Sequence, residues 1–353
     1  MKRILIIGCG GSAGYNFVRS LKMSEEEFIT IGTDINREHL ELSNCDIKYL
    51  VPKNTNKKYI DIINKIIAVE KIDFMHIQPD VEVAFWSKNR DRINTKFELP
   101  TENAIDLCHN KMKFNTLLSE NKVPVPESYQ INNKPDIKEA FEKLIRNHEK
   151  IWVRAIRGAG SKASLPIKNL EHAEMWIDYW NKNKNTTYSD FMLSEFLPGK
   201  EYAFQSIWKD GELITSQARE RQEYVFGNLM PSGQSSSPAV AETVHNKLVN
   251  KISTDAIRSV DKNATGIFCV DLKENNNGIP CVTEINIGRF FTTNDFFSEA
   301  GCNMPIYYLK LAFGEKIPAL KKYNALPIKL SWIRIIDMGK KLVKGGKWSY
   351  REI

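Results

Sequence analysis

Long apolar runs are missing from this sequence. No stretch approaches the roughly 18 consecutive apolar residues of a membrane-spanning helix. Residues 1–8 form a short apolar run that ends at a glycine, and they lack the small-residue cleavage region of a signal peptide, so we expect a buried strand there. The sequence therefore predicts no stable membrane insertion.

Paired cysteine spacing is missing as well. Several of the cysteines lie in apolar runs, as buried free thiols do; they are Cys9, Cys45, Cys108, Cys269, Cys281 and Cys302. This pattern favours a reducing, cytoplasmic location and argues against a zinc site. The histidines are scattered and indicate neither a ligand cluster nor a catalytic triad.

Net positive charge is missing outside the carboxyl end. The net charge of the chain is +7, and nine basic and two acidic residues follow Leu320, so this segment alone accounts for it. A nucleic-acid binder would spread its basic residues over a folded face, so we predict no nucleic-acid partner. We expect residues 321–353 to be a solvated basic tail, with contact to an anionic partner as the alternative. Within it, Ile328 to Ile336 alternates enough to be a strand.

What is present is the composition of a soluble enzyme with two or three domains, 42% hydrophobic and 26% charged over 353 residues. Residues 1 to about 108 alternate between strand and helix patterns. Apolar strands are expected at 4–7, 28–32 and 72–77, with an amphipathic helix at 59–69. Such alternation predicts a parallel sheet with crossover helices.

A glycine-rich loop follows the first strand. Gly8, Gly10, Gly11 and Gly14 open a helix, and Asp34 stands twenty residues after Gly14, where a ribose-binding carboxylate would lie in a dinucleotide site. The glycine spacing departs from that fingerprint. The loop more simply joins strand and helix, and NAD binding is the alternative.

A second glycine loop follows the strand that we expect at 150–155. It runs from Arg157 to Ser164, and its two glycines let the backbone approach phosphate oxygens, while Arg154 and Lys162 supply positive charge. Its spacing is not that of a P-loop. An ordinary surface turn is the alternative for this motif taken alone.

Acidic residues gather on a predicted hairpin. Glu284 and Asn286 are two residues apart, so a strand places both on one face, and the Asn/Gly-rich turn at 273–280 folds Asp271 back beside them. Arg289 follows closely. Mg²⁺ bound to polyphosphate uses few protein oxygens and takes the rest from phosphate and water. The hairpin therefore predicts such a site.

Taken in order, these motifs resemble the ATP-grasp superfamily, in particular the branch of the carbamoyl phosphate synthetase large subunit and biotin carboxylase, over roughly residues 1–315. The resemblance implies an α/β fold that is α+β in its ATP-binding part. A Rossmann-like pre-ATP-grasp domain would span 1–108. A two-lobed ATP-grasp domain would span 109–320, with its smaller lobe at about 124–196 and its larger lobe at about 197–320, and the basic tail 321–353 would follow.

The resemblance also implies the site residues. Adenine would contact Glu195, Phe196 and Leu197, and ribose would contact Glu201. Phosphates would meet Lys111, Arg154 and the loop residues Gly158, Gly160 and Ser161. Mg²⁺, with Mn²⁺ as an alternative ion, would sit on Asp271, Glu284 and Asn286. Arg289 and Arg219 would bind a substrate carboxylate or a developing oxyanion.

Two departures from the family pattern stand out. Arg154 occupies a strand position that is often lysine, and either residue is cationic. Gly288 intervenes between Asn286 and Arg289, where the family usually has Glu-x-Asn-x-Arg, and this insertion is expected to bulge the backbone and re-aim the guanidinium.

The function implied by the resemblance is ATP-dependent ligation of a small-molecule carboxylate to an amine through an acyl phosphate, with amino acids as candidate substrates. An ATP-grasp enzyme that carboxylates or phosphorylates its substrate is the first alternative. An NAD-dependent oxidoreductase and a nucleotide-binding scaffold without chemistry are the others. A homodimer is an open option.

Overall fold

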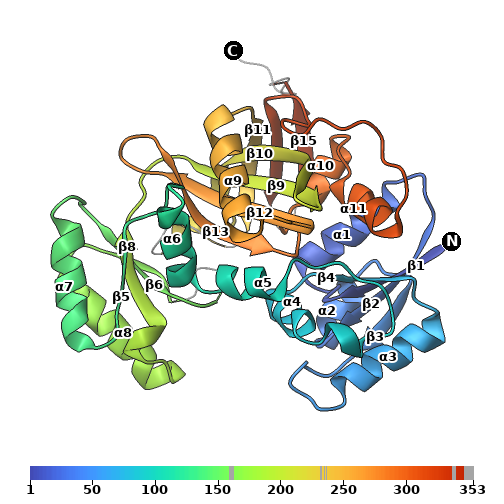
Figure 1. Ribbon diagram of the computed structural model, residues 1–353, viewed down its shortest axis with the longest axis horizontal. Helices are drawn as coiled ribbons and strands as arrows, with labels where there is room; N and C mark the ends of the chain where they lie inside the picture. The colour runs from blue at the N-terminus through green and yellow to red at the C-terminus, as the bar shows by residue number, and fades with distance from the viewer. Residues whose placement is uncertain (159–162, 231–232, 234, 236, 336–338, 346–353) are drawn as a thin grey trace.

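The structure is a computed structural model that describes residues 1–158, 163–230, 233, 235, 237–335 and 339–345. These residues build three sheets, which lie side by side in Figure 1. The mixed α/β architecture agrees with the predicted fold class. None of the helices in the described ranges is long and apolar enough to cross a membrane.

The amino-terminal sheet is parallel, in the order β3-β2-β1-β4, which confirms the expected alternation. Its strands are β1 (Lys2–Ile7), β2 (Phe28–Asp34), β3 (Ile47–Leu50) and β4 (Phe74–Ile77). Its helices are α1 (Ser12–Lys22), α2 (Arg37–Leu42), α3 (Tyr59–Glu70), α4 (Asp80–Ser87) and α5 (Glu102–Cys108), with the short helix η1 (Arg90–Arg92) after α4. The apolar run that we expected to be a strand is buried in β1.

A small antiparallel sheet with its own core lies at the far end of the molecule, in green in Figure 1. Its order is β5-β8-β6-β7, with β5 (Ser128–Gln130), β6 (Ile151–Ala155), β7 (Leu165–Ile167) and β8 (Phe191–Glu195). Helices α7 (Lys134–Ile145) and α8 (Leu170–Lys184) pack on it, and η2 (Tyr188–Asp190) precedes β8. Helix α6 (Lys111–Glu120) leads into this lobe with the predicted bounds, because the Asn110 side chain caps it by accepting from the Lys113 amide.

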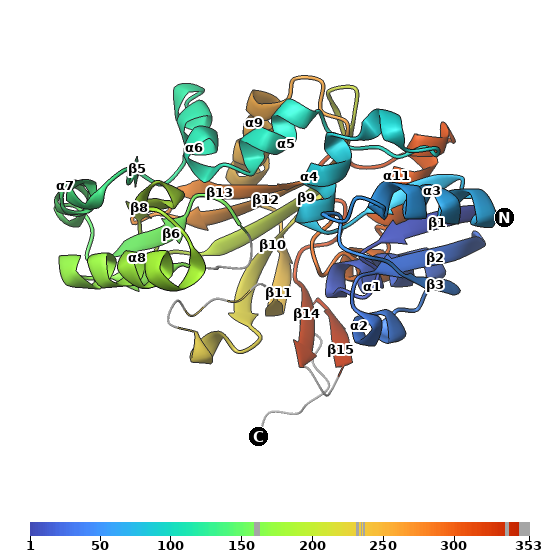
Figure 2. The ribbon, with the colours of Figure 1, turned by 90° about the horizontal axis from the view of Figure 1, so that it is seen from below.

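The large sheet has the order β13-β12-β9-β10-β11-β14-β15. Its strands are β9 (Glu201–Lys209), β10 (Glu212–Tyr224), β11 (Pro238–Val244), β12 (Gly266–Glu274), β13 (Pro280–Ile287), β14 (Leu330–Ile335) and β15 (Gly339–Lys344). Helix α9 (Lys247–Val260) covers one face (Figure 2). Helices α10 (Asp295–Glu299) and α11 (Met304–Phe313) pack on the other face and also contact α1, which ties the large sheet to the amino-terminal domain.

Several boundaries differ from those that the sequence predicts. The pattern from Thr243 to Val260 predicts a helix, but α9 begins at Lys247, because Thr243 and Val244 end β11 and the Asn246 side chain caps the helix. The sequence also predicts a strand from Leu213 to Arg219 and a loop at 227–239. Strand β10 instead runs on to Tyr224, and the predicted loop holds η3 (Gly227–Leu229) and the start of β11.

The segment that we set apart as a tail joins the large sheet. The strand expected at Ile328 to Ile336 is β14, which pairs with β11, and β15 pairs with β14 in turn. The boundary between residues 320 and 321 stays a prediction.

Candidate active site

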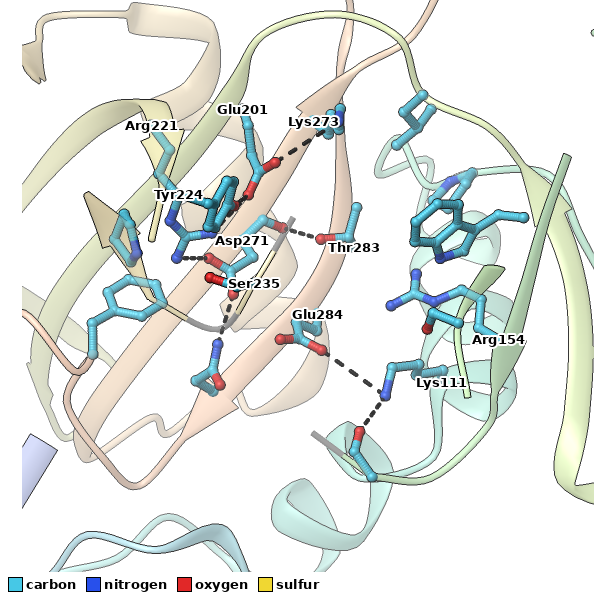
Figure 3. Close-up of a pocket in the computed structure, with 18 of the residues that line it drawn as sticks. Lys111, Arg154, Glu201, Arg221, Tyr224, Ser235, Asp271, Lys273, Thr283 and Glu284 are labelled. Atoms are coloured by element: carbon cyan, nitrogen blue, oxygen red, sulfur yellow. Dashed lines mark hydrogen bonds and ion pairs between the residues drawn. The ribbon is translucent and has the colours of Figure 1, made fainter. Parts of the chain in front are cut away.

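A cavity of about 420 Å³ is lined by both the small lobe and the large sheet. Figure 3 shows side chains converging on it from the two sides. Every predicted site residue that the structure describes lines this cavity: Lys111, Arg154, Gly158, Glu195, Phe196, Leu197, Glu201, Arg219, Asp271, Glu284, Asn286 and Arg289. Gly160 and Ser161 lie outside the described residues.

The acidic hairpin folds as the sequence suggests. Asp271 of β12 stands opposite Glu284 of β13 in an antiparallel pair, and the Asn286 amide donates to Asp271 Oδ2 at 2.8 Å. Burial raises the pKa of Asp271 to about 7; Arg221 opposes this rise, while the nearby carboxylates of Glu284 and Glu201 add to it. Crowded, desolvated carboxylates of this kind are stabilised by an added cation.

These residues fit a hard divalent ion that arrives with phosphate. Asp271 and Glu284 offer two carboxylates, and Asn286 adds an amide oxygen. Within the described ranges, no three His, Cys, Asp or Glu side chains are grouped so as to hold a metal unaided. An ion here would therefore complete its shell with phosphate oxygens and water, as Mg²⁺ does in nucleotide sites.

Arg221 lines the cavity but was not among the predicted site residues. Its guanidinium donates to Glu201 Oε1 at 3.0 Å and pairs with Asp271 Oδ1 at 2.7 Å (Figure 3). Burial lowers the pKa of Arg221, but Asp271, Tyr224 and Glu201 outweigh burial and hold the pKa well above its usual value. The available signal was alternation: Arg221 is two residues beyond Arg219 and so shares its face of β10, but we ended that strand at Arg219.

The predicted ribose ligand, Glu201, is engaged by several side chains. Besides Arg221, the Tyr224 hydroxyl bonds to it, and Lys273 Nζ lies 3.8 Å from its Oε2. A ribose hydroxyl that bonds to Glu201 must share or replace these donors.

Cations stand at the small-lobe side of the cavity. Lys111 Nζ donates to the Gly158 carbonyl at 2.8 Å and lies 3.9 Å from Glu284 Oε2. Burial lowers the pKa of Lys111, although Glu284 opposes this, and burial also lowers the pKa of Arg154. Polyphosphate would compensate these desolvated charges.

The segment after β8 contributes apolar side chains to one end of the cavity. The Glu195 amide donates to the Glu127 carbonyl at 2.8 Å, which fixes the start of this segment. The rings of Phe196 and Trp152 lie 5.8 Å apart, and both line the cavity with Leu197. A planar base suits such a surface. Trp152 was not among the predicted site residues.

Arg289 turns toward the amino-terminal domain. Its Nη2 donates to Asp80 Oδ2 at 2.9 Å, and a further bond joins it to Asn286. Gly288 has a φ of +74°, and a Cβ there would stand 3.0 Å from Leu99 Cδ2. The inserted glycine thus adopts a backbone that favours glycine, and the guanidinium after it is paired with Asp80 of α4.

Arg219 lies at the deep end of the cavity with an exposed fraction of 1%. Its Nη1 donates to the Thr293 carbonyl at 3.3 Å, and its guanidinium lies over the rings of Phe291 and Phe297 at 5.4 and 5.3 Å. Burial lowers the pKa of Arg219 to about 9, and Arg221 adds to the effect. Among the described residues it has no ion-pair partner.

The amino-terminal glycine loop is held together from within. Asp34 Oδ2 accepts from the Gly10 amide and Oδ1 from the Asn36 amide, both at 3.0 Å. A Cβ on Gly10 would stand 2.6 Å from the carbonyl carbon of His39. These contacts give Asp34 and Gly10 packing roles, and the NAD alternative loses its free ribose-binding carboxylate.

Comparisons with known proteins converge on one fold. An ATP-grasp domain model matches residues 108–293. No curated protein sequence matches the chain. N5-carboxyaminoimidazole synthetase from Staphylococcus aureus, complexed with ADP, superposes with a TM-score of 0.70 at 15% identity over 95% of this chain and 82% of that one.

Two further solved structures are similar. The β-γ-ATP complex of biotin carboxylase from Campylobacter jejuni gives a TM-score of 0.70 at 14% identity, over 94% of this chain and 74% of that one. L-amino acid ligase from Bacillus licheniformis gives a TM-score of 0.66 at 12% identity, over 94% of this chain and 79% of that one. At these identities the likeness shows the fold.

Proposed function

The chain belongs to the ATP-grasp family of ATP-dependent ligases, and from this premise we propose that it joins a small-molecule carboxylate to an amine, with ADP and phosphate as products. One observation carries the proposal. One cavity is lined by apolar side chains, buried cations and crowded carboxylates. These three groups suit adenine, the phosphates and a metal ion, respectively.

Nucleotide binding would use both lobes. Adenine lies in the slot of Phe196, Leu197 and Trp152, and the ribose hydroxyls bond to Glu201. Lys111 and Arg154 hold the phosphates, beside Gly158, whose carbonyl accepts from Lys111. Because both cations are desolvated, their attraction to phosphate is strong.

Asp271, Glu284 and Asn286 would hold Mg²⁺, or Mn²⁺ in its place, and the bound ion neutralises phosphate charge. The paired strands β12 and β13 hold these three residues in place, and the residues in turn set where the phosphates lie. Most of the rate enhancement in phosphoryl transfer comes from such positioning and charge neutralisation.

The chemistry then needs no protein nucleophile. A carboxylate oxygen of the substrate attacks the γ-phosphorus, and the bond from that phosphorus to ADP breaks. The amine attacks the resulting acyl carbon, phosphate leaves with the acyl C–O electrons, and the amine nitrogen loses a proton. Arg289 and Arg219 would bind a carboxylate or the oxyanion of the tetrahedral intermediate.

A substrate panel tests the reaction class. Phosphate release from Mg²⁺-ATP is measured with carboxylic acids, alone and with amines, and hydroxylamine serves as a trap for an acyl phosphate. We expect release only when an acid and an amine are both present, and a hydroxamate when hydroxylamine replaces the amine. Release with bicarbonate alone would contradict ligation and favour a carboxylating enzyme. A homodimer and a cytoplasmic location stay predictions.

A further inference from the structure

Arg221 joins two parts of the cavity that the proposed function assigns to different ligands. One nitrogen of its guanidinium lies 2.7 Å from Asp271, a proposed metal ligand, and the other lies 3.0 Å from Glu201, the proposed ribose ligand. These carboxylates come from different strands, β12 and β9. Only a side chain with two separated donor groups bridges them in this way, which suits the fork of arginine.

Both oxygens of Asp271 have a neighbouring side chain. Oδ1 forms the ion pair with Arg221, and Oδ2 accepts a hydrogen bond from the Asn286 amide at 2.8 Å. The side-chain oxygen of Asn286 in turn accepts a hydrogen bond from Arg289. A divalent ion that approaches this state meets ligands already occupied by donors and a guanidinium next to the position it needs.

Glu284 differs from these two ligands. Its nearest cation, Lys111, lies 3.9 Å away, beyond hydrogen-bond distance. The obstacle to metal binding is therefore centred on Asp271 and Asn286. Among the described residues, Arg221 is the cation that forms an ion pair with Asp271, and its charge has the same sign as that of the ion.

Arg221 can be released from the other end of the bridge. When a ribose hydroxyl bonds to Glu201, it competes with Arg221 for the same carboxylate. The guanidinium also lies 5.2 Å from the ring of Phe291 and lines an open cavity, so it has room to shift without leaving an aromatic face.

We propose that Arg221 is a positioning residue that keeps the metal ligand Asp271 occupied until a nucleoside engages Glu201, so that the ion is accepted with the nucleotide and not before it. This inference rests on the proposed function, because it uses the same nucleotide and metal sites. It adds a coupling between them. Such coupling is reciprocal: a nucleoside that raises the affinity for the ion must itself bind more tightly when the ion is present.

Adenosine and Mn²⁺ are the probes that isolate this coupling. Adenosine has the ribose hydroxyls but no phosphate, so it cannot carry the ion into the site by chelating it. The affinity for Mn²⁺ is measured by electron paramagnetic resonance of the free ion, with and without adenosine. In the wild-type protein we expect adenosine to tighten Mn²⁺ binding by roughly five- to a hundred-fold.

Arg221→Met should remove the coupling. Without adenosine, this variant should bind Mn²⁺ more tightly than the wild type does, by about the factor that adenosine produces in the wild type. Adenosine should change the Mn²⁺ affinity of the variant little. Arg221→Lys keeps the charge but has a single nitrogen, so it should also lose the coupling, with an affinity between the other two. Lys273→Met is the matched control, because it removes another cation beside Glu201 but none beside Asp271; its coupling should resemble the wild type.

A merely structural role gives different results. In that case Arg221→Met would lower the melting temperature and leave Mn²⁺ binding unchanged or weaker. The wild-type measurement decides the matter even if Arg221→Met does not fold: adenosine that binds without altering Mn²⁺ affinity overturns the inference. Failure of adenosine to bind at all would instead overturn the nucleotide site itself, and the proposed function with it.

Discussion

Asp34 and Asp271 both lie at or near the end of an apolar strand, and they are held in opposite ways. Backbone amides of Gly10 and Asn36 donate to the two oxygens of Asp34. The two oxygens of Asp271 contact side chains instead: one forms an ion pair with Arg221, and the other accepts a hydrogen bond from Asn286. Backbone donors are fixed by the fold, whereas side chains can move away when a ligand arrives.

The surroundings of the two carboxylates differ as well. Asp34 closes a loop in which a Cβ on Gly10 would collide with the backbone of His39. Asp271 lines a cavity and lies near two other carboxylates, Glu284 and Glu201. The comparison indicates that the first aspartate serves the fold and the second serves a ligand, although either residue fits a nucleotide-site motif in the sequence.

The largest effect that the comparison predicts is on turnover. Asp271→Asn keeps the shape of the side chain but removes the charge, so acid- and amine-dependent phosphate release should fall by about a hundred-fold or more, as when a group that stabilises transition-state charge is lost. The melting temperature should stay near that of the wild type, since a crowded buried carboxylate has been relieved. A variant that turns over normally would remove Asp271 from the site.

The opposite pattern is expected for Asp34→Asn. The new amide group would face one of the two backbone amides, leaving a donor unsatisfied, so the free energy of unfolding should fall by about 1–3 kcal/mol. Denaturant unfolding measures this loss. The rate of phosphate release per folded molecule should not change; a loss of rate without a loss of stability would break the distinction between the two aspartates.

The last effect is absent at neutral pH and concerns the acid stability of the amino-terminal domain. His76 is buried against the ring of Phe17, 3.7 Å away, and burial lowers the pKa of His76 to about 4. The unfolded chain takes up this proton near pH 6.5 while the folded chain stays neutral, so stability is present above that pH and falls by about 1.4 kcal/mol per pH unit on acidification toward pH 4.

His76→Gln has no proton to gain, so its unfolding free energy should lack this part of the slope. Denaturant titrations of both proteins at several pH values compare the slopes. Equal slopes would show that other groups cause the acid sensitivity of the amino-terminal domain.

Much of the fold followed from local patterns. The first sheet, helix α6 and the β12–β13 hairpin were predictable because apolar runs, the Asn110 cap and the Asn/Gly-rich turn act within a few residues. The start of α9 was misplaced, since the apolar pattern from Thr243 onward does not reveal that Thr243 and Val244 pair with β10.

The site residues that lie close together in the sequence were predictable, whereas contacts between residues far apart in the sequence were not. Glu284 and Asn286 follow from strand alternation. The bridge from Arg221 to Glu201 and Asp271 depends on the sheet order β12-β9-β10, which no local pattern reveals. The pairing of Arg289 with Asp80 likewise joins segments about two hundred residues apart.

The most direct test of the central claim is ligand-induced stabilisation. Melting temperatures of the wild type and of Asn286→Ala are measured with Mg²⁺-ATP and, in parallel, with NAD(H), because a ligand that binds the native state raises its stability by mass action. We predict that Mg²⁺-ATP stabilises the wild type, stabilises Asn286→Ala much less, and that NAD(H) has no effect. Stabilisation by NAD(H) and not by Mg²⁺-ATP would contradict the assignment as an ATP-dependent ligase.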